Sequence, residues 1–112
     1  MVILQPLEFA PGQICAMEWG ATMSLVNFFE VVRVTKASVW FRELPNEVTE
    51  HDGYGQAGKK APITDSSDDE KGPIFRKKIQ TSSFDGQQFA HEEYRGNIEP
   101  WNGQPVIFNT YD

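Results

Sequence analysis

The sequence predicts a mainly β protein: a small single-domain barrel or roll of about six or seven short antiparallel strands, with one long acidic loop. Residues 27–44 (NFFEVVRVTKASVWFREL) contain two runs of β-branched and aromatic side chains joined by a polar turn, which is typical of a β-hairpin. Further short apolar runs recur at close spacing between turn signals, as in small all-β folds. The 112 residues, 39% of them hydrophobic, are enough for one modest core.

The hairpin within 27–44 is the centre of the predicted fold, and we place its loop at 35–38. Val34 then lies opposite Val39. Two positions further from the loop, Val32 lies opposite Phe41. Because side chains alternate between the two faces of a strand, these four share one face, which we assign to the core.

The other face of the hairpin carries Arg33 opposite Trp40, which predicts a cation–π pair worth about 0.5–1 kcal/mol at an exposed site. The same register places Glu30 opposite Glu43. Like charges directly opposite each other are unfavourable, so we expect a bulge or the end of strand pairing there. A helix is the alternative for 25–34, because its apolar residues also fit helical spacing, but the density of Val and Phe favours a strand.

The remaining elements are predicted in chain order. A short edge strand is expected at 2–4, and the next strand at 13–19 (QICAMEW). One face of that second strand carries Ile14, Ala16 and Glu18, and the other carries Cys15, Met17 and Trp19. Later strands are expected at 74–80 and 88–94, around an Asp85-Gly86 turn, and a closing strand at 106–111. Asn102-Gly103 before it is a hairpin signal.

The net charge of −6 is concentrated in one segment, because residues 47–70 hold seven carboxylates against two lysines. We predict that 45–73 is a long connection, ordered around Pro62-Ile63 and loose around 66–71. Its carboxylates are the predicted partner-binding residues: Glu47, Glu50, Asp52, Asp65, Asp68, Asp69 and Glu70. Charge complementarity with a basic partner would give them specificity and a fast association rate.

Few residues suggest catalysis or metal binding. Cys15 and either His51 or His91 would be needed for a Cys–His nucleophile, but no flanking signature supports one. The histidines and carboxylates lack metal-site spacing. Residues 53–58 (GYGQAG) match a nucleotide-binding fingerprint without the strand–turn–helix context that it requires. We therefore expect a protein that is not an enzyme and has no cofactor or bound metal.

The location is expected to be the cytoplasm. Cys15 is the single cysteine, so no internal disulfide forms, as is usual in a reducing compartment. The first nine residues (MVILQPLEF) lack the basic segment of a signal peptide. No apolar run approaches the 18 residues of a membrane span, so no membrane association is expected.

A basic cluster indicates an alternative function, nucleic-acid binding. Arg76, Lys77 and Lys78 follow Phe75, and Trp40 lies on the predicted hairpin. Small barrels bind single-stranded nucleic acid by combining basic grooves with stacked aromatic rings. At most two of the three consecutive cations share one face of a strand. The ordinary alternative is an exposed strand that its positive charge protects from edge-to-edge aggregation.

The chain also resembles a family of small proteins carried by bacteriophages and bacterial mobile elements. The resemblance rests on Trp19-Gly20, then 27–36 (NFFEVVRVTK) and Ser38-Val39, set beside the family pattern W-G, a polar spacer, and N-x-[FY]-[FYQ]-x-V-x-x-V-T-x-x-[ST]-V, from which this chain departs by having one residue fewer between Asn27 and Val31. The similarity extends through Pro62, Gly72, Arg76-Lys77, Trp101-Asn102-Gly103, Pro105 and Tyr111. The spacer at 21–26 is more apolar here than in that pattern. The resemblance implies a phage-like context inside a bacterial host cell and brings no activity or cofactor.

Two functional hypotheses follow. The first is a non-enzymatic interaction protein that binds a host or element-encoded protein through its acidic segment, such as an anti-CRISPR-like inhibitor of a host defence nuclease. The second is a small barrel that binds single-stranded nucleic acid through Trp40, Phe75, Arg76, Lys77 and Lys78.

Overall fold

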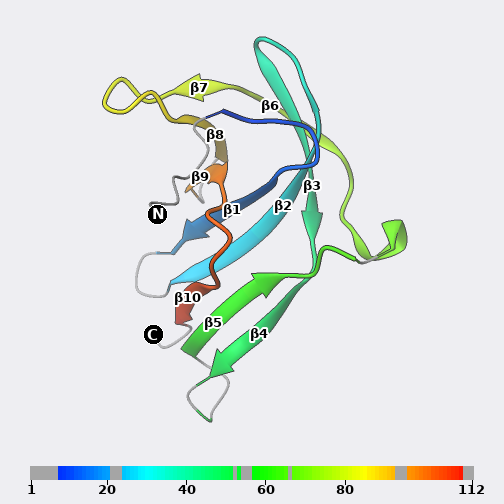
Figure 1. Cartoon of the computed structure of the whole chain (residues 1–112), viewed down its shortest axis with the longest axis vertical. Coiled ribbons are helices and arrows are strands. Elements are labelled where there is room, and N and C mark those ends of the chain that lie inside the picture. The colour runs from blue at the N-terminus through cyan, green and yellow to red at the C-terminus, as the bar shows by residue number, and fades with distance from the viewer. Residues whose placement is uncertain are drawn as a thin grey trace, which may run out of the picture.

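The computed structural model describes residues 8–20, 24–51, 53, 57–65, 67–92 and 96–109. This part of the chain forms ten β-strands and one 3₁₀ turn: β1 Ile14–Trp19, β2 Leu25–Val34, β3 Ser38–Leu44, β4 Asn46–His51, β5 Ala57–Pro62, η1 Asp68–Glu70, β6 Phe75–Lys78, β7 Gln80–Thr81, β8 Gln88–Glu92, β9 Gly96–Pro100 and β10 Val106–Asn109. The strands form a seven-stranded antiparallel sheet, β6-β3-β2-β1-β9-β8-β7, and a three-stranded sheet, β10-β5-β4 (Figure 1). The predicted mainly β fold is confirmed.

The larger sheet curls into a nearly closed barrel because the chain from 75 to 81 changes its partner halfway. β6 pairs with β3, whereas β7, which follows after Ile79, pairs with β8. The two edges of the sheet are therefore joined by one bent segment. Where β6 runs beside β8, no ladder links the two strands in the described chain. We name this stretch, between Phe75–Lys78 and Ala90–Glu92, the seam.

Strand alternation divides the apolar side chains between two cores. The barrel interior contains Phe9, Cys15, Met17, Phe29, Val31, Val39, Phe41, Ala90 and Ile98. The second core lies between the two sheets and contains Val26, Phe28, Leu44 and Phe108. The predicted faces of β1 are confirmed, since Cys15 and Met17 face the interior while Ile14 and Ala16 pack on the second core. β1 and β2 are thus covered on both sides.

The central hairpin contains a bulge at Val32, which changes the predicted register. Near the loop, Val34 pairs with Val39 and Arg33 with Trp40, as predicted. Beyond the bulge, Val31 rather than Val32 lies opposite Phe41. The assignment of Val32 to the core is therefore wrong: its side chain is 39% exposed, and Val31 is buried instead. The predicted bulge itself is confirmed.

The prediction of a long irregular connection over 45–73 is wrong for much of that segment. β4 and β5 occupy 46–51 and 57–62 and pair with each other in antiparallel register. The β5 sequence AGKKAP has low strand propensity, but β5 is the central strand of its sheet, between β4 and β10. Its Lys60 Nζ lies 4.7 Å from the Phe108 ring centroid. Pairing on both sides and contact with Phe108 outweigh the local preference.

The Asn102-Gly103 signal marks a turn but not a hairpin. Gln104 N–H donates to Asn102 Oδ1 at 2.9 Å, and Gly103 has φ = 87°. The flanking strands belong to different sheets, because β9 pairs with β1 and β8 while β10 pairs with β5. The turn therefore passes the chain from one sheet to the other. The strand predicted at 2–4 lies outside the described residues.

Candidate functional site

The outward side of β2, β3 and β6 gathers basic side chains around one tryptophan. Arg33 lies opposite Trp40, and Trp40 lies opposite Arg76 on the next strand. Residues directly opposite on neighbouring antiparallel strands point to the same side. The Arg33 guanidinium carbon lies 4.7 Å from the Trp40 ring centroid, so the predicted cation–π pair is confirmed. With Lys78 of β6 and Lys36 of the β2–β3 turn, these three residues form what we name the basic face.

The cations of the basic face are exposed and have no carboxylate partner in the part of the chain that the structure describes. Arg33, Lys36, Arg76 and Lys78 are all exposed, and none forms an ion pair with a described residue. Other cations of the chain do have carboxylate partners: Arg42, Lys59, Lys71 and Lys77. In a protein with a net charge of −6, the basic face is therefore a local positive surface.

The five residues predicted for nucleic-acid binding do not all lie on this face. Trp40, Arg76 and Lys78 share it, as alternation allows. Phe75 and Lys77 lie opposite the buried Phe41 and Val39, so they face the barrel interior. The structure thus splits the predicted set between the two faces of the sheet formed by β3 and β6.

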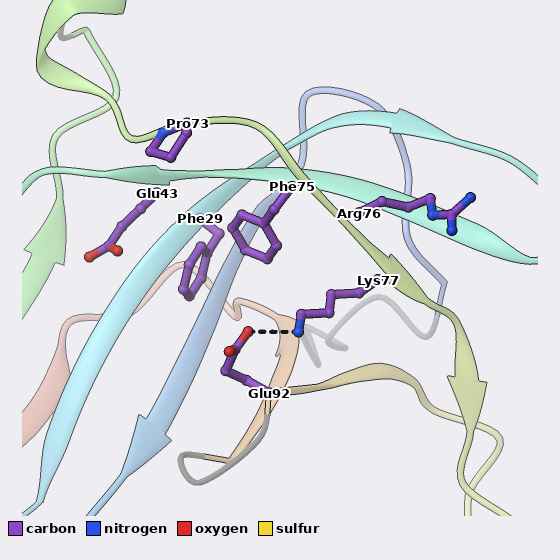
Figure 2. A pocket seen from close by; sticks show the side chains of 7 residues that line it. All are labelled: Phe29, Glu43, Pro73, Phe75, Arg76, Lys77 and Glu92. Atoms are coloured by element: carbon purple, nitrogen blue, oxygen red, sulfur yellow. Dashed lines mark ion pairs between the residues drawn. The ribbon is translucent and has the colours of Figure 1, made fainter.

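The inward-facing residues line a cleft at the seam. The cleft has a volume of about 340 Å³ and is lined by Phe29, Glu43, Pro73, Phe75, Arg76, Lys77 and Glu92. Figure 2 shows the two phenylalanine rings between the Glu43 carboxylate and the Lys77–Glu92 pair. The ring centroids of Phe29 and Phe75 are 5.8 Å apart, edge to face. We name this hollow the seam cleft.

An ion pair spans the seam where a strand ladder would otherwise run. Lys77 Nζ lies 3.1 Å from Glu92 Oε2. β7 and β8 pair Gln80 with Phe89 and Thr81 with Gln88, and continuing that register by three residues would bring 77 opposite 92. The side chains therefore meet in register while the backbones do not pair, which leaves strand edges on both sides of the cleft.

A chain of hydrogen bonds positions Glu43 in the seam cleft. Trp19 Nε1–H donates to Asn27 Oδ1 at 2.6 Å, and Asn27 Nδ2–H donates to Glu43 Oε2 at 2.9 Å. The three residues come from β1, β2 and β3. Each is on the face of its strand that carries the interior side chains. This network holds a carboxylate at the end of the barrel.

The predicted partner-binding carboxylates are spread over separate elements. Glu47 and Glu50 lie exposed on β4, and Glu50 pairs with Lys59 at 3.4 Å. Asp65, Asp69 and Glu70 are exposed in the connection between β5 and β6. Asp68 begins η1, and Asp52 lies outside the described residues.

The part of this acidic segment that follows β5 is tied to the barrel at both ends. Ile63 N–H donates to Pro45 O at 2.8 Å, and Gly72 N–H donates to Glu43 O at 2.9 Å. We name the stretch between these bonds the acidic loop, residues 64–71. In Figure 1 it projects beside the junction of β3 and β4. Its second anchor places its end at the rim of the seam cleft.

Cys15 and His91, the residues considered for catalysis whose side chains the structure describes, do not come together. Cys15 is fully buried in the barrel interior, and this burial raises the pKa of its thiol, which disfavours the reactive thiolate. His91 is exposed on β8, next to the buried Ala90, and its Nδ1 lies 3.0 Å from Asn97 Oδ1. The side chain of His51 is outside the described set. Within the described ranges, no group of three or more His, Cys, Asp or Glu residues is placed to hold a metal ion.

Several residues of these surfaces carry no sequence signal for a binding site. Glu43, Glu92 and Phe29 line the seam cleft, but each belongs to a different strand and only the closure of the barrel brings them together. The hairpin register predicted from the sequence pairs Arg33 with Trp40. That pairing is the sequence signal that indicates the basic face.

The part of the chain that the structure describes contains no helix long and apolar enough to cross a membrane. No family model, no curated protein and no solved structure matches the chain. The resemblance to phage and mobile-element proteins therefore stays a prediction, and the surfaces of the structure are what bears on the function.

Proposed function

We propose that the protein binds single-stranded nucleic acid through the basic face. The observation that carries this proposal is the row Arg33, Trp40 and Arg76, which the register of β2, β3 and β6 places side by side. Arginine and lysine neutralise phosphates, and an aromatic ring offers a stacking platform for a base worth about 1–3 kcal/mol. A duplex is less suitable, because its stacked bases do not reach a ring on a flat strand surface.

Salt dependence gives the proposal a quantitative form. Four cations of this face, none of them paired with a described carboxylate, limit the number of phosphates that it can contact directly: Arg33, Lys36, Arg76 and Lys78. For single strands, the slope of log K against log salt concentration is about −0.7 for each phosphate neutralised, so a slope of roughly −2 to −3 is expected.

The test is a titration of a fluorescent oligothymidylate at several salt concentrations. The wild-type protein should bind with the slope stated above. The triple variant Arg33→Gln, Arg76→Gln, Lys78→Gln should bind at least about tenfold more weakly at low salt. Lys59→Gln with Lys60→Gln, two cations on β5, is the control and should retain most of the affinity. No binding by the wild type at low salt would refute the proposal.

A second candidate function is favoured by the acidic loop. Asp65, Asp69 and Glu70 are exposed and form no ion pair with a described residue. We propose as the alternative that this loop binds a basic protein surface, such as the nucleic-acid channel of a host defence nuclease, in a phage or mobile-element context. Such an interaction protein would not be an enzyme and would act by charge complementarity.

The two candidates are separated by capture from a bacterial lysate with and without nuclease treatment. A protein partner should remain bound after nuclease treatment and be lost when Asp65, Asp68, Asp69 and Glu70 are neutralised together. If a protein partner stays bound both after nuclease treatment and after these carboxylates are neutralised, the acidic loop is not its binding surface. Material lost on nuclease treatment, and lost from the triple variant of the basic face, supports nucleic-acid binding instead.

A further inference from the structure

The seam cleft combines an apolar floor with carboxylates at its sides. The Phe29 and Phe75 rings form the floor, and Glu43 and Glu92 stand on either side of them (Figure 2). An arginine or lysine side chain has the complementary form, since its aliphatic stem packs on apolar surface while its charged end seeks an anion. The cleft lies on the inward side of β6, and Arg76, which belongs to the basic face, also contributes to its lining.

One half of the cleft already holds a basic side chain of this chain. Lys77 Nζ lies 3.1 Å from Glu92 Oε2 and 6.0 Å from the Phe75 ring centroid. The pair is partly shielded, because the side chains of Lys77 and Glu92 are 27% and 29% exposed. An ammonium group between a carboxylate and an aromatic ring is a favourable arrangement for a cation.

The other half of the cleft also has a carboxylate beside a phenylalanine ring, but no cation of the described chain pairs with that carboxylate. Glu43 lies directly opposite Phe29 on the neighbouring strand. Its carboxylate accepts one hydrogen bond, from Asn27, and forms no ion pair with a described residue. A carboxylate has about four acceptor positions, so most of its capacity remains. The Trp19–Asn27 hydrogen bond holds the Asn27 amide in place, and Asn27 in turn orients the Glu43 carboxylate before any ligand binds.

We propose that the seam cleft binds an arginine or lysine side chain presented on an extended peptide segment of a partner protein. Its stem packs on Phe29, and its charged end bonds the Glu43 carboxylate. Charge complementarity supports this occupant, because Glu43 forms no ion pair with a described residue and the acidic loop ends at the same rim through the Gly72–Glu43 hydrogen bond. The facing edges of β6 and β8, which form no ladder with each other or with another described strand, offer backbone groups to an extended segment. The volume of about 340 Å³ is sufficient for one side chain.

The test is a calorimetric or NMR titration with the capped peptide Gly-Arg-Gly and its neutral counterpart, in which citrulline replaces arginine. The wild type should prefer the arginine peptide. Glu43→Gln keeps the shape and an acceptor for Asn27 but removes the charge, and should weaken binding about tenfold. Glu50→Gln, which removes an exposed carboxylate on β4, is the control and should leave the affinity within about twofold.

A second variant is expected to strengthen binding of the arginine peptide. Lys77→Met removes the internal cation and makes Glu92 available, so it should strengthen arginine-peptide binding several-fold. Equal binding of both peptides, or unchanged binding in Glu43→Gln, would overturn the proposal. If Glu43→Gln does not fold, as judged by circular dichroism, the Lys77→Met result decides, and the absence of a gain refutes the site. Oligonucleotide binding by the basic face should be the same in Glu43→Gln as in wild type, so the two proposals can fail separately.

Discussion

Glu30 lies opposite Arg42 on the central hairpin, with its Oε1 3.0 Å from Arg42 Nη2 and 3.1 Å from Nε. The bulge at Val32 creates this pair, because an unbroken register would place Glu30 opposite Glu43. The same displacement sets Glu43 opposite Phe29, where its carboxylate reaches Asn27 and lines the seam cleft. One extra residue in β2 therefore replaces a repulsive pair with an attractive one and also builds the cleft.

The two adjacent valines test the bulge directly. Val31→Ala should lower the free energy of unfolding by about 2 kcal/mol, because Val31 is buried at 1% exposure and its truncation leaves a cavity. Val32→Ala should cost less than about 1 kcal/mol, because Val32 is 39% exposed. Urea unfolding measures both. The reverse order would mean that the regular register, with Val32 in the core, is the correct one.

Removing the charge of Glu30 should destabilise the fold more than removing an exposed carboxylate does. Its Oε1 also lies 3.6 Å from Lys71 Nζ, and the Lys71 side chain is only 8% exposed. Glu30→Gln would remove the carboxylate charge that Arg42 and Lys71 share, so a loss of about 1–2 kcal/mol is expected. Glu50→Gln breaks an exposed pair with Lys59 and should cost at most about 0.5 kcal/mol. Equal losses in urea unfolding would contradict the structure.

The sequence was sufficient for the elements whose local signals agree with their surroundings. The hairpin of β2 and β3 has high strand propensity and a buried face, and β1 alternates cleanly. β5 was missed because its sequence, AGKKAP, has low strand propensity and becomes a strand only between β4 and β10. The opposition of Glu30 to Glu43 predicts a bulge nearby, but its position at Val32 depends on which pairing best buries Val31 and joins Glu30 to Arg42.

The candidate surfaces were predictable only in part, for a similar reason. Alternation correctly limited how many of the cations Arg76, Lys77 and Lys78 share a face, and the register put Arg33 beside Trp40. Which strand would lie on the far side of β3 could not be read from the sequence, because that pairing is long-range. The seam cleft exists only because β6 and β7 pair with different strands, a property of the closed barrel and not of any segment.

Stability should depend on pH through Glu99. Burial, and then the carboxylates of Asp85 and Glu18, raise the pKa of Glu99 above its ordinary value of 4.5. The folded state then binds the proton more tightly than the unfolded state, so this contribution is present below pH 4.5 and is lost as the pH rises through the raised value. Glu99→Gln should increase Tm at pH 7 and leave it unchanged at pH 3.

Thermal unfolding at the two pH values measures the Glu99 effect. Glu47→Gln, which removes an exposed carboxylate from β4, controls for the change in net charge alone. A gain in Tm at pH 7 that is as large in Glu47→Gln would mean that overall charge, and not the surroundings of Glu99, produces the effect.

Two neighbours on β6 distinguish a specific nucleic-acid surface from general electrostatic attraction. Arg76 is exposed on the basic face, whereas Lys77 points to the seam cleft and pairs with Glu92. Arg76→Gln and Lys77→Gln remove the same charge at consecutive positions. Arg76→Gln should weaken oligothymidylate binding several-fold and reduce the steepness of the salt slope by about 0.7, while Lys77→Gln should leave both within error. Equal effects would show that binding follows net charge, and the row of Arg33, Trp40 and Arg76 would then have no special part in it.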